Sequence, residues 1–479
     1  MNALSNKIKA FQNISKQLEP SEAERDEYVK QLSGYTSSFI NTLDETHAYS
    51  DAQEDASLLQ LDGKKKSFTE LLEIYASEVA TKGINAASGG HLGYIPGGGI
   101  FTAALGDFLA DVTNEYAGMH YASPGAVRME NEILDWMKSI FGFPKLAAGN
   151  LTSGGSIANL IALTAARDKH GVKSERVPTS VIYISEQAHH CIHKALRIIG
   201  LEDVIIRHID LDKKSCMRPE DLSKKLALDR ANGLHPFLVI ASAGTTDTGA
   251  VDPLLQIGEI AKSNEIWYHV DAAYGGFFIL TESKKDLFVG IEMADSLVID
   301  PHKGLFLPYG IGAVLVKDID AIYHSNFLRA NYMQDVIGDE SPINPADVSP
   351  ELTKHFRGMR LWLPLQLHGI EPFVACLEEK LLLTQYFRSN LKDLGFQLGP
   401  EPDLSVSYFW YPVDSGDENA FNEKLMKVIH KDGEIFLSST VIKGKFVIRM
   451  AILSFRTKLE TIDKAVEMIA RALKATSQS

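Results

Sequence analysis

The chain has 479 residues, of which 45% are hydrophobic and 23% charged, and its formal net charge is -14. This balance is typical of a globular protein with ample material for a core, and the negative charge argues against nucleic acid or an anionic membrane as the main partner. The three cysteines, Cys191, Cys216 and Cys376, lie too far apart for a disulfide framework or a thiolate zinc site.

The first residues, MNALSNKIKAFQ, lack the apolar stretch of a signal peptide. No apolar run in the sequence approaches the ~18 residues that a membrane span needs. We therefore expect a soluble cytoplasmic protein.

Residues 1–85 are predicted to form helices. Ser21 with Glu24, and Ser67 with Glu70, have the spacing of capping boxes that open helices. The segment has apolar faces but little core of its own, so we expect it to pack on a second subunit.

Residues 86–370 alternate between short apolar runs (SVIYIS, PFLVIASA, IWYHVD, SLVID) and helical stretches such as NLIALTAARD and PLLQIGEIAKS. This alternation predicts an α/β domain with a parallel sheet covered by helices on both faces. Residues 371–479 change character, with an apolar strand KFVIRMAIL between helical segments, and predict a smaller α+β domain.

Ligands of such sheets bind beyond the carboxyl ends of the strands, so the residues that follow each run are informative. His189 follows SVIYIS, Thr246 follows PFLVIASA, Asp271 ends IWYHVD, and Lys303 comes shortly after SLVID. Four predicted strand ends therefore offer an imidazole, a hydroxyl, a carboxylate and an amine.

A possible phosphate seat is the segment TSGGSIANL, in which Gly154, Gly155 and Ser156 precede a predicted helix. Glycines allow close backbone approach, and a helix N-terminus offers unpaired N–H groups to an anion. Neither a GK[ST] sequence nor a GxGxxG motif is present, and a Gly-Gly pair before a helix is more often only a turn.

Pyridoxal 5′-phosphate needs all of these groups together. Its aldehyde requires a lysine amine, its pyridine nitrogen a carboxylate, its phosphate a helix N-terminus, and its ring a stacking partner. A bond to this cofactor would also explain why Lys303 stands between two apolar runs, where an ammonium is costly to bury.

The segments HVDAAYGG and SLVIDPHKGL resemble the group II pyridoxal-phosphate-dependent amino-acid decarboxylases, and TSGGSIANL, ASPGAVRME and GTTDTGAVDPL match that family as well. The resemblance implies the aspartate aminotransferase-like fold (fold type I), with a mainly parallel seven-stranded sheet in residues 86–370. It also implies a homodimer with active sites at the interface, and decarboxylation of an L-amino acid to an amine and CO₂.

The same resemblance assigns four catalytic residues. Lys303 would form the Schiff base, Asp271 would pair with the pyridinium nitrogen, and His189 would stack on the ring. Tyr332, in RANYMQD, matches a loop tyrosine that protonates the substrate Cα.

Further cofactor contacts follow from the matching motifs. Gly155 and Ser156 would hold the phosphate, Thr246 would lie beside the cofactor, Ala273 would lie against the ring, and His302 would neighbour the lysine. Asp300 stands where the family often has asparagine near the phosphate, and we leave it out of the phosphate site because it would place an anion beside an anion.

The substrate site is expected around GYIPGGG, with Tyr94 and Ile95 as walls and Tyr116 contributed by a partner chain. Gly97 stands where aromatic decarboxylases carry a small hydroxyl residue. We favour an aromatic L-amino acid as the substrate, because of Tyr94 and Ile95, and place an acidic or diamino acid second.

Other functions remain open on the sequence. An aminotransferase would share Lys303 and Asp271, an aldehyde synthase would release ammonia and peroxide, and a non-enzymatic relict of the fold would bind no cofactor. His189 and His193 share a helix face as metal ligands can, but no HExxH motif accompanies them, and we expect no metal.

Overall fold

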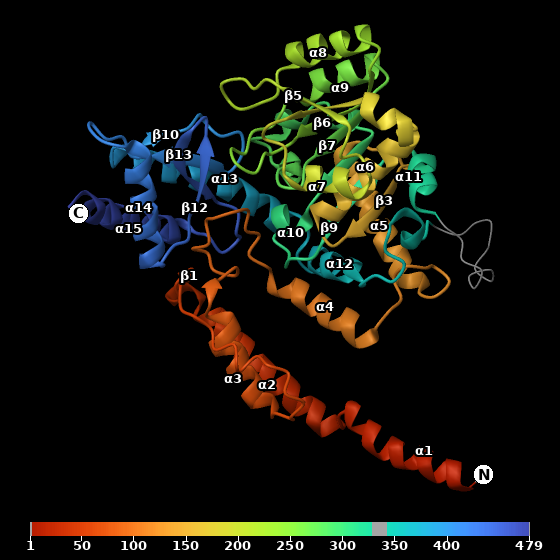
Figure 1. Cartoon of the computed structure of the whole chain (residues 1–479). Coiled ribbons are helices and arrows are strands. Elements are labelled where there is room, and N and C mark those ends of the chain that lie inside the picture. Colours follow the sequence, from red (N-terminus) through yellow and green to blue (C-terminus); the bar gives the residue numbers. More distant parts are fainter. Residues whose placement is uncertain (1, 328–342, 479) are drawn as a thin grey trace.

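The computed structural model describes residues 2–327 and 343–478, and it begins with a helical arm that projects from the rest of the chain (Figure 1). The helices of the arm are α1 (Asn2–Ser15), α2 (Glu22–Asn41) and α3 (Phe68–Tyr75). The predicted capping box of Ser21 and Glu24 is present in both directions. At the start of α3, the Ser67 hydroxyl accepts a hydrogen bond from the Glu70 N–H at 3.2 Å.

A seven-stranded sheet forms the centre of the molecule, in the order β3-β9-β8-β7-β6-β4-β5. Its strands are β3 (Ala148–Thr152), β4 (Ser180–Ser185), β5 (Ile205–Ile209), β6 (His235–Ser242), β7 (Trp267–Asp271), β8 (Ser296–Ile299) and β9 (Gly312–Val316). Strand β9 runs antiparallel to β3 and β8, and every other neighbouring pair is parallel. The predicted mainly parallel seven-stranded sheet is confirmed.

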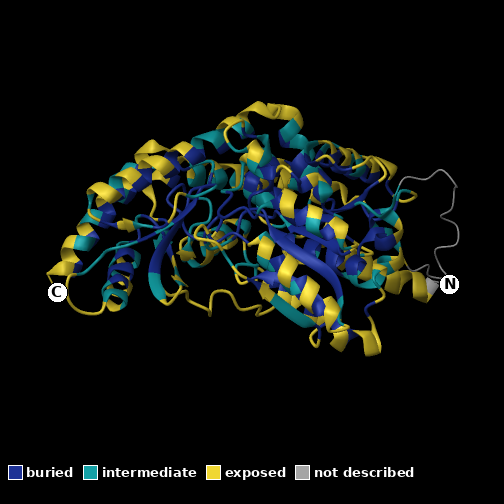
Figure 2. Cartoon of the chain, turned by 90° about the horizontal axis from the view of Figure 1, so that it is seen from above, coloured by how far each residue is buried: buried dark blue, intermediate teal, exposed yellow. Residues whose placement is uncertain are grey.

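Helices cover both faces of this sheet, so its strands are buried on each side, apart from the edge strand β5, which is mostly half-buried (Figure 2). In β4, Val181 and Tyr183 belong to one apolar core, whereas Ile182 and Ile184 belong to the other. A strand buried on both faces needs a continuous apolar run, and SVIYIS is such a run. The helices of this unit are α4 (Phe101–Thr113), α5 (Pro124–Phe141), α6 (Gly155–Lys169), α7 (Cys191–Ile198), α8 (Pro219–Ala231), α9 (Leu254–Ser263), α10 (Pro301–Gly304), α11 (Ile319–Asn326) and α12 (Arg357–His368).

The carboxyl-terminal unit has its own antiparallel sheet, in the order β10-β11-β13-β12, and its own apolar core. Ile448 and Met450 of β13 pack there against Leu425 and Ile429 of α14 and against Ile469 of α15. Its elements are α13 (Glu371–Asp393), β10 (Gln397–Leu398), β11 (Val406–Trp410), α14 (Glu418–Asp432), β12 (Ser438–Ile442), β13 (Lys445–Ala451) and α15 (Leu459–Ser477). Within the described ranges, no helix is both long and apolar enough to cross a lipid bilayer.

Arg449 of β13 joins this smaller unit to the central one. Its Nη1 donates to the Tyr94 carbonyl at 2.9 Å and to the Ser438 hydroxyl at 3.1 Å, and its Nη2 donates to the Thr246 carbonyl. The guanidinium is almost completely buried. One side chain thus fixes two loops of the central unit relative to the β12–β13 hairpin.

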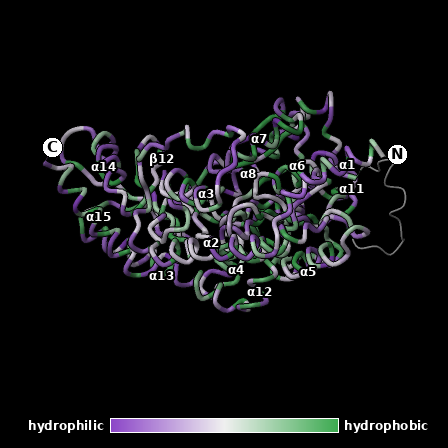
Figure 3. Tube along the Cα trace, turned by 90° about the horizontal axis from the view of Figure 1, so that it is seen from below, coloured by the Kyte–Doolittle hydropathy of each residue, from purple (hydrophilic) through white to green (hydrophobic). Residues whose placement is uncertain are grey.

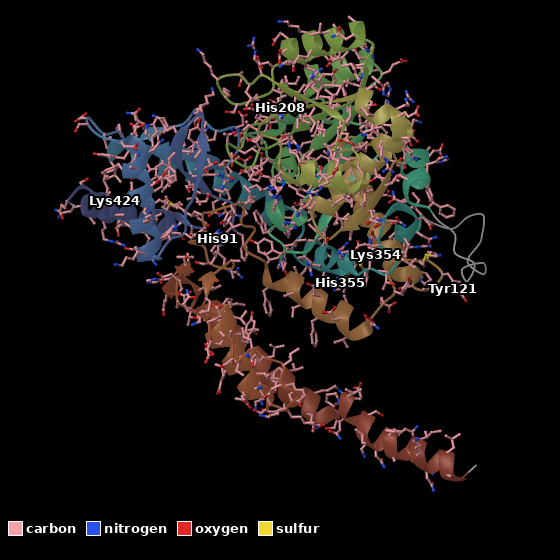
Figure 4. The ribbon with its side chains drawn as sticks, in the orientation of Figure 1. His91, Tyr121, His208, Lys354, His355 and Lys424 are labelled. Carbon is pink, nitrogen blue, oxygen red and sulfur yellow. The ribbon has the colours of Figure 1, made fainter. Side chains whose placement is uncertain are left out.

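A second buried cation, Lys354, supports β3 just before the chain enters α6. Its Nζ lies 2.7 Å from Oε1 of Glu130 and donates to the Leu151 carbonyl at 2.8 Å, while the Leu151 N–H donates to the same Glu130 oxygen. Both side chains are fully buried, and Lys354 lies inside the central unit near α12 (Figure 4). An ion pair without solvent contact is stabilising only while both partners remain.

We expect Lys354→Met to destabilise the protein by about 3–5 kcal/mol, because the Glu130 carboxylate would be left buried without its cation. Thermal unfolding followed by circular dichroism measures the effect. The double variant Lys354→Met with Glu130→Gln is the matched control and should recover a large part of the loss. A single variant with an unchanged Tm would contradict the importance of the pair.

Candidate active site

A cavity of about 430 Å³ opens where β7 and β8 end and where α6 and α10 begin. Parallel strands bring their carboxyl ends to the same edge of a sheet, which is why residues far apart in sequence meet here. All eight predicted cofactor-contacting residues line this cavity: Gly155, Ser156, His189, Thr246, Asp271, Ala273, His302 and Lys303.

Lys303 is held by a carboxylate from the turn before it. Its Nζ lies 2.9 Å from Oδ2 of Asp300, which caps α10 and is itself buried. Burial alone would lower the pKa of Lys303, but the charge and hydrogen bond of Asp300 outweigh it and raise that pKa above its usual value. Without the cofactor, the amine is therefore an ammonium with its counter-ion in the same helical turn.

Asp271 is the acceptor at the end of a buried chain of hydrogen bonds. Asn159 of α6 donates from Nδ2 to Oδ2 of Asp271 at 3.3 Å, and Oδ1 of Asn159 lies 2.8 Å from Nε2 of His269. Nδ1 of His269 lies 2.8 Å from the Ser296 hydroxyl, which accepts a hydrogen bond from the indole N–H of Trp267.

The direction of this chain follows from the chemistry of its members. Complete burial lowers the pKa of His269 to about 4, so its imidazole is neutral and carries one proton. Because the Asn159 amide donates to Asp271, its oxygen must accept, and the proton of His269 is therefore on Nε2. Nδ1 then accepts from the Ser296 hydroxyl, and every group in the chain is oriented so that the Asn159 amide donates to Asp271.

The sequence argument missed Asn159 and His269, although both carried a signal. Each is a polar residue in a segment that is otherwise apolar, and each is fully buried. A buried polar side chain needs a partner, so such residues indicate a hydrogen-bond network. Which partners they reach depends on how α6 lies over β7, and spacing along the chain does not give that.

The first turn of α6, which is the predicted phosphate seat, forms one end of the cavity. A Cβ on Gly155 would lie 2.9 Å from Oδ2 of Asp300, and a Cβ on Gly312 would lie 2.6 Å from Oδ1. Asp300 thus approaches closely at position 155, whereas at position 312 the Gly154 backbone, 2.7 Å from such a Cβ, would obstruct a side chain as well. Asp300, which the sequence argument kept apart from the phosphate seat, lines the same cavity as Gly155 and Ser156.

Two imidazoles lie on the cavity wall, and burial lowers the pKa of each. Nδ1 of His189 accepts a hydrogen bond from the Cys191 N–H at 3.3 Å, whereas Nδ1 of His302 donates to the Ile311 carbonyl. The ring of Tyr309, which also lines the cavity, meets the His302 ring edge-on at 5.8 Å between centroids. Tyr309 was not singled out from the sequence.

The predicted substrate residues Tyr94, Ile95, Gly97 and Tyr116 are absent from the lining of this single-chain cavity. Ile95 is part of the apolar core, and the Tyr116 hydroxyl donates to the Leu352 carbonyl at 3.3 Å. A Cβ on Gly97 would lie 2.1 Å from the His302 carbonyl oxygen, so packing gives a reason for glycine there. Their substrate role stays a prediction, and Tyr332 lies outside the described residues.

Comparison with known proteins assigns the family. The model of the pyridoxal-dependent decarboxylase conserved domain matches residues 60–412. The chain belongs to this family. It is 34% identical over 375 residues to an aromatic-L-amino-acid decarboxylase of Bacillus atrophaeus, covering 77% of this chain and 78% of the relative.

Two further relatives agree with this assignment. Tryptophan decarboxylase 2 of Oryza sativa subsp. japonica is 31% identical over 396 residues, or 79% of each chain. A crystal structure of Oryza sativa TDC with PLP and tryptamine superposes with a TM-score of 0.89 at 23% identity, covering 95% of this chain and 99% of that one. This protein is thus a pyridoxal-phosphate-dependent amino-acid decarboxylase of fold type I.

The residues of the cavity fit that cofactor. Asp271 is an oriented carboxylate, Lys303 supplies an amine, and the first turn of α6 has no Cβ at Gly155 that would fill the anion seat. These are the three groups that the pyridine nitrogen, the aldehyde and the phosphate require.

The neutral state of His269 predicts a pH dependence of stability. Its folded pKa of about 4 lies below the ordinary value of 6.5, so the unfolded chain takes up this proton first as the pH falls. The contribution is fully present above pH 6.5 and is lost between pH 6.5 and 4, by about 3 kcal/mol at most.

We therefore expect the Tm of His269→Gln to fall less steeply than that of the unaltered protein between pH 6.5 and 4.5. His91 and His170, whose pKa values burial also lowers to about 4, contribute equally to both proteins and cancel in the comparison. If the Tm of both proteins fell equally with pH, His269 would have the same pKa in the folded and in the unfolded chain, and the prediction would be wrong.

Proposed function

We propose that this decarboxylase acts on an aromatic L-amino acid and releases CO₂ and the corresponding aromatic amine. The observation that carries the proposal is its 34% identity to an aromatic-L-amino-acid decarboxylase over most of both chains.

In this proposal, the amine of Lys303 would hold the cofactor covalently. Asp271, fixed by Asn159, would accept a hydrogen bond from the protonated pyridine nitrogen, and Gly155 and Ser156 at the start of α6 would hold the phosphate. His189 and Ala273 enclose the ring from the two sides, with Thr246 and His302 beside it. When bound, pyridoxal 5′-phosphate accepts the electron pair that CO₂ leaves on Cα.

The remaining step is a proton transfer to Cα. We assign it to Tyr332, which lies outside the described residues, on the family resemblance of RANYMQD alone. A phenol next to the substrate Cα would protonate that carbon and exclude water. It would thereby favour release of the amine over oxidation to an aldehyde. Tyr332→Phe should then divert part of the turnover from amine to aldehyde.

We further propose a homodimer with the active site at the interface, where the arm of residues 1–85 packs on the partner. Helices α1 and α4 support this, because each exposes large apolar side chains on one face, and hydrophobic residues recur along both (Figure 3). On α1 these side chains are Leu4, Ile8, Phe11 and Ile14, and on α4 they are Phe101, Leu105, Phe108, Leu109 and Val112. Tyr94, which is exposed in the single chain, would then be covered at the mouth of the site.

Product analysis tests the substrate. The full-length protein with added cofactor is given aromatic, acidic and diamino L-amino acids, each separately, and amines and CO₂ are followed by mass spectrometry. We expect an aromatic amine and CO₂ in equal amounts, without ammonia or peroxide. An acidic or diamino product would overturn the substrate assignment but keep the reaction, and a keto acid would overturn the reaction.

Replacement of the lysine tests its role. We expect Lys303→Ala to lower turnover by about 1,000-fold or more, as removal of one member of a catalytic set does. After borohydride reduction, the cofactor mass should stay on the peptide that contains Lys303 in the unaltered protein. The exposed Lys213→Ala is the matched control and should keep both properties. A label on another lysine would refute the assignment.

A further inference from the structure

The carboxylate of Asp300 occupies a charged environment that the assigned reaction does not explain. The side chain is buried, its Oδ2 pairs with Nζ of Lys303 at 2.9 Å, and its Oδ1 has no hydrogen-bond partner among the described residues. Both oxygens lie against the first turn of α6, because a Cβ on Gly155 would be 2.9 Å from Oδ2 and 3.4 Å from Oδ1. This is the seat for the phosphate of the cofactor.

Charge balance at this seat depends on Lys303. The second pKa of a phosphate monoester is about 6, so the group is mainly a dianion at neutral pH. Lys303 is the one Lys or Arg side chain in the described lining, and its ammonium offsets the single charge of Asp300. A bound dianion would therefore add negative charge that no described side chain of the lining offsets. A buried carboxylate and a dianion would then share one helix N-terminus, which carries only a partial positive charge.

Of the groups that face Asp300, none other is suited to take up a proton. Nε2 of His302 in α10 lies 3.6 Å from Oδ2 of Asp300. Burial lowers the pKa of His302, however, and its Nδ1–H donates a hydrogen bond to the Ile311 carbonyl. Burial likewise lowers the pKa of His189, ahead of α7, and raises the pKa of the Cys191 thiol to about 12. Asp271 at the end of β7 already accepts two N–H hydrogen bonds, from Asn159 and Ala273.

We propose that Asp300 takes up one proton from solvent when the phosphate of the cofactor binds, and that the resulting carboxylic acid donates a hydrogen bond to a phosphate oxygen. No bond other than this O–H forms, and no group is oxidised or reduced. The unpartnered Oδ1 is the atom that gains the proton. Cofactor binding is thereby coupled to pH, and an asparagine at this position would donate from its amide without any proton uptake.

The coupling rests on the proposed function, with pyridoxal 5′-phosphate as the cofactor. The test separates the assignment of this cofactor from the proton uptake by Asp300. The full-length protein, freed of cofactor, is titrated with pyridoxine 5′-phosphate, which carries the phosphate but has no aldehyde to bond with Lys303. Its Kd is measured from pH 7 to 9 for the unaltered protein and for Asp300→Asn. Pyridoxine, which lacks the phosphate, is the matched ligand control.

As the pH rises, we expect the Kd of the unaltered protein to increase more steeply than that of Asp300→Asn. The difference should reach about tenfold per pH unit, since one proton is bound with the ligand. Pyridoxine should show no such difference between the two proteins. Equal pH slopes for both proteins would overturn the proposal and would point to His302 or the phosphate itself as the proton acceptor. Failure to bind pyridoxal 5′-phosphate at any pH would instead overturn the cofactor assignment.

A proton count on the unaltered protein alone keeps the proposal testable should Asp300→Asn fold poorly. Titration calorimetry at pH 8 in two buffers of different ionisation enthalpy gives the protons taken up on binding. We expect about one more proton with pyridoxine 5′-phosphate than with pyridoxine. An equal count for the two ligands would refute the coupling.

Discussion

The burial of the Lys303 ammonium is the constraint on which the active site depends. An unpaired ammonium would not remain charged in an apolar interior, and Asp300 supplies the counter-ion from the same turn. This pairing places a carboxylate at the first turn of α6, so close to Gly155 that a Cβ there would lie 2.9 Å from Oδ2. The glycine-rich phosphate seat and the lysine are therefore one unit built around an ion pair.

The two ends of the cavity are stabilised by different means. At the ring end, Asp271 is oriented by a chain of neutral groups that leads through Asn159 and His269 to Ser296. Neutral groups fix a direction for each hydrogen bond without bringing further charge near the carboxylate. Near the start of α6, the buried ion pair of Lys354 and Glu130 holds the backbone of β3, away from the cavity itself.

The fold could be predicted from the sequence because its signals are local. A strand that is buried on both faces must be apolar throughout, as SVIYIS is, and ligand groups must follow the ends of parallel strands, as Asp271 and Lys303 do. The network around Asp271 could not be predicted in this way. Asn159 reaches Asp271 from a helix more than a hundred residues earlier, and only the packing of α6 against β7 brings them together.

Asp300 and Gly97 show a second limit of sequence reasoning. Each departs from the family pattern, and each was interpreted through the ligand that the family binds. The structure gives both a neighbour within the protein: Lys303 for Asp300, and the His302 carbonyl for Gly97. The identity of a residue next to a ligand site is constrained by its protein contacts as well as by the ligand. The sequence alone does not show which of these two constraints is the stronger.

Arg449 has a consequence for how the chain can be divided. The strand order assigns the cavity to the central sheet, yet the backbone at Tyr94 and at Thr246 is held by a guanidinium that comes from β13. A fragment that ended at residue 370 would contain every lining residue of the cavity and still lack this support. The smaller unit is therefore a structural part of the active site. The apolar cores do not divide before α13 either, because Phe373 and Leu377 of α13 belong to the core of the central unit, whereas Phe387 belongs to the core of the smaller one.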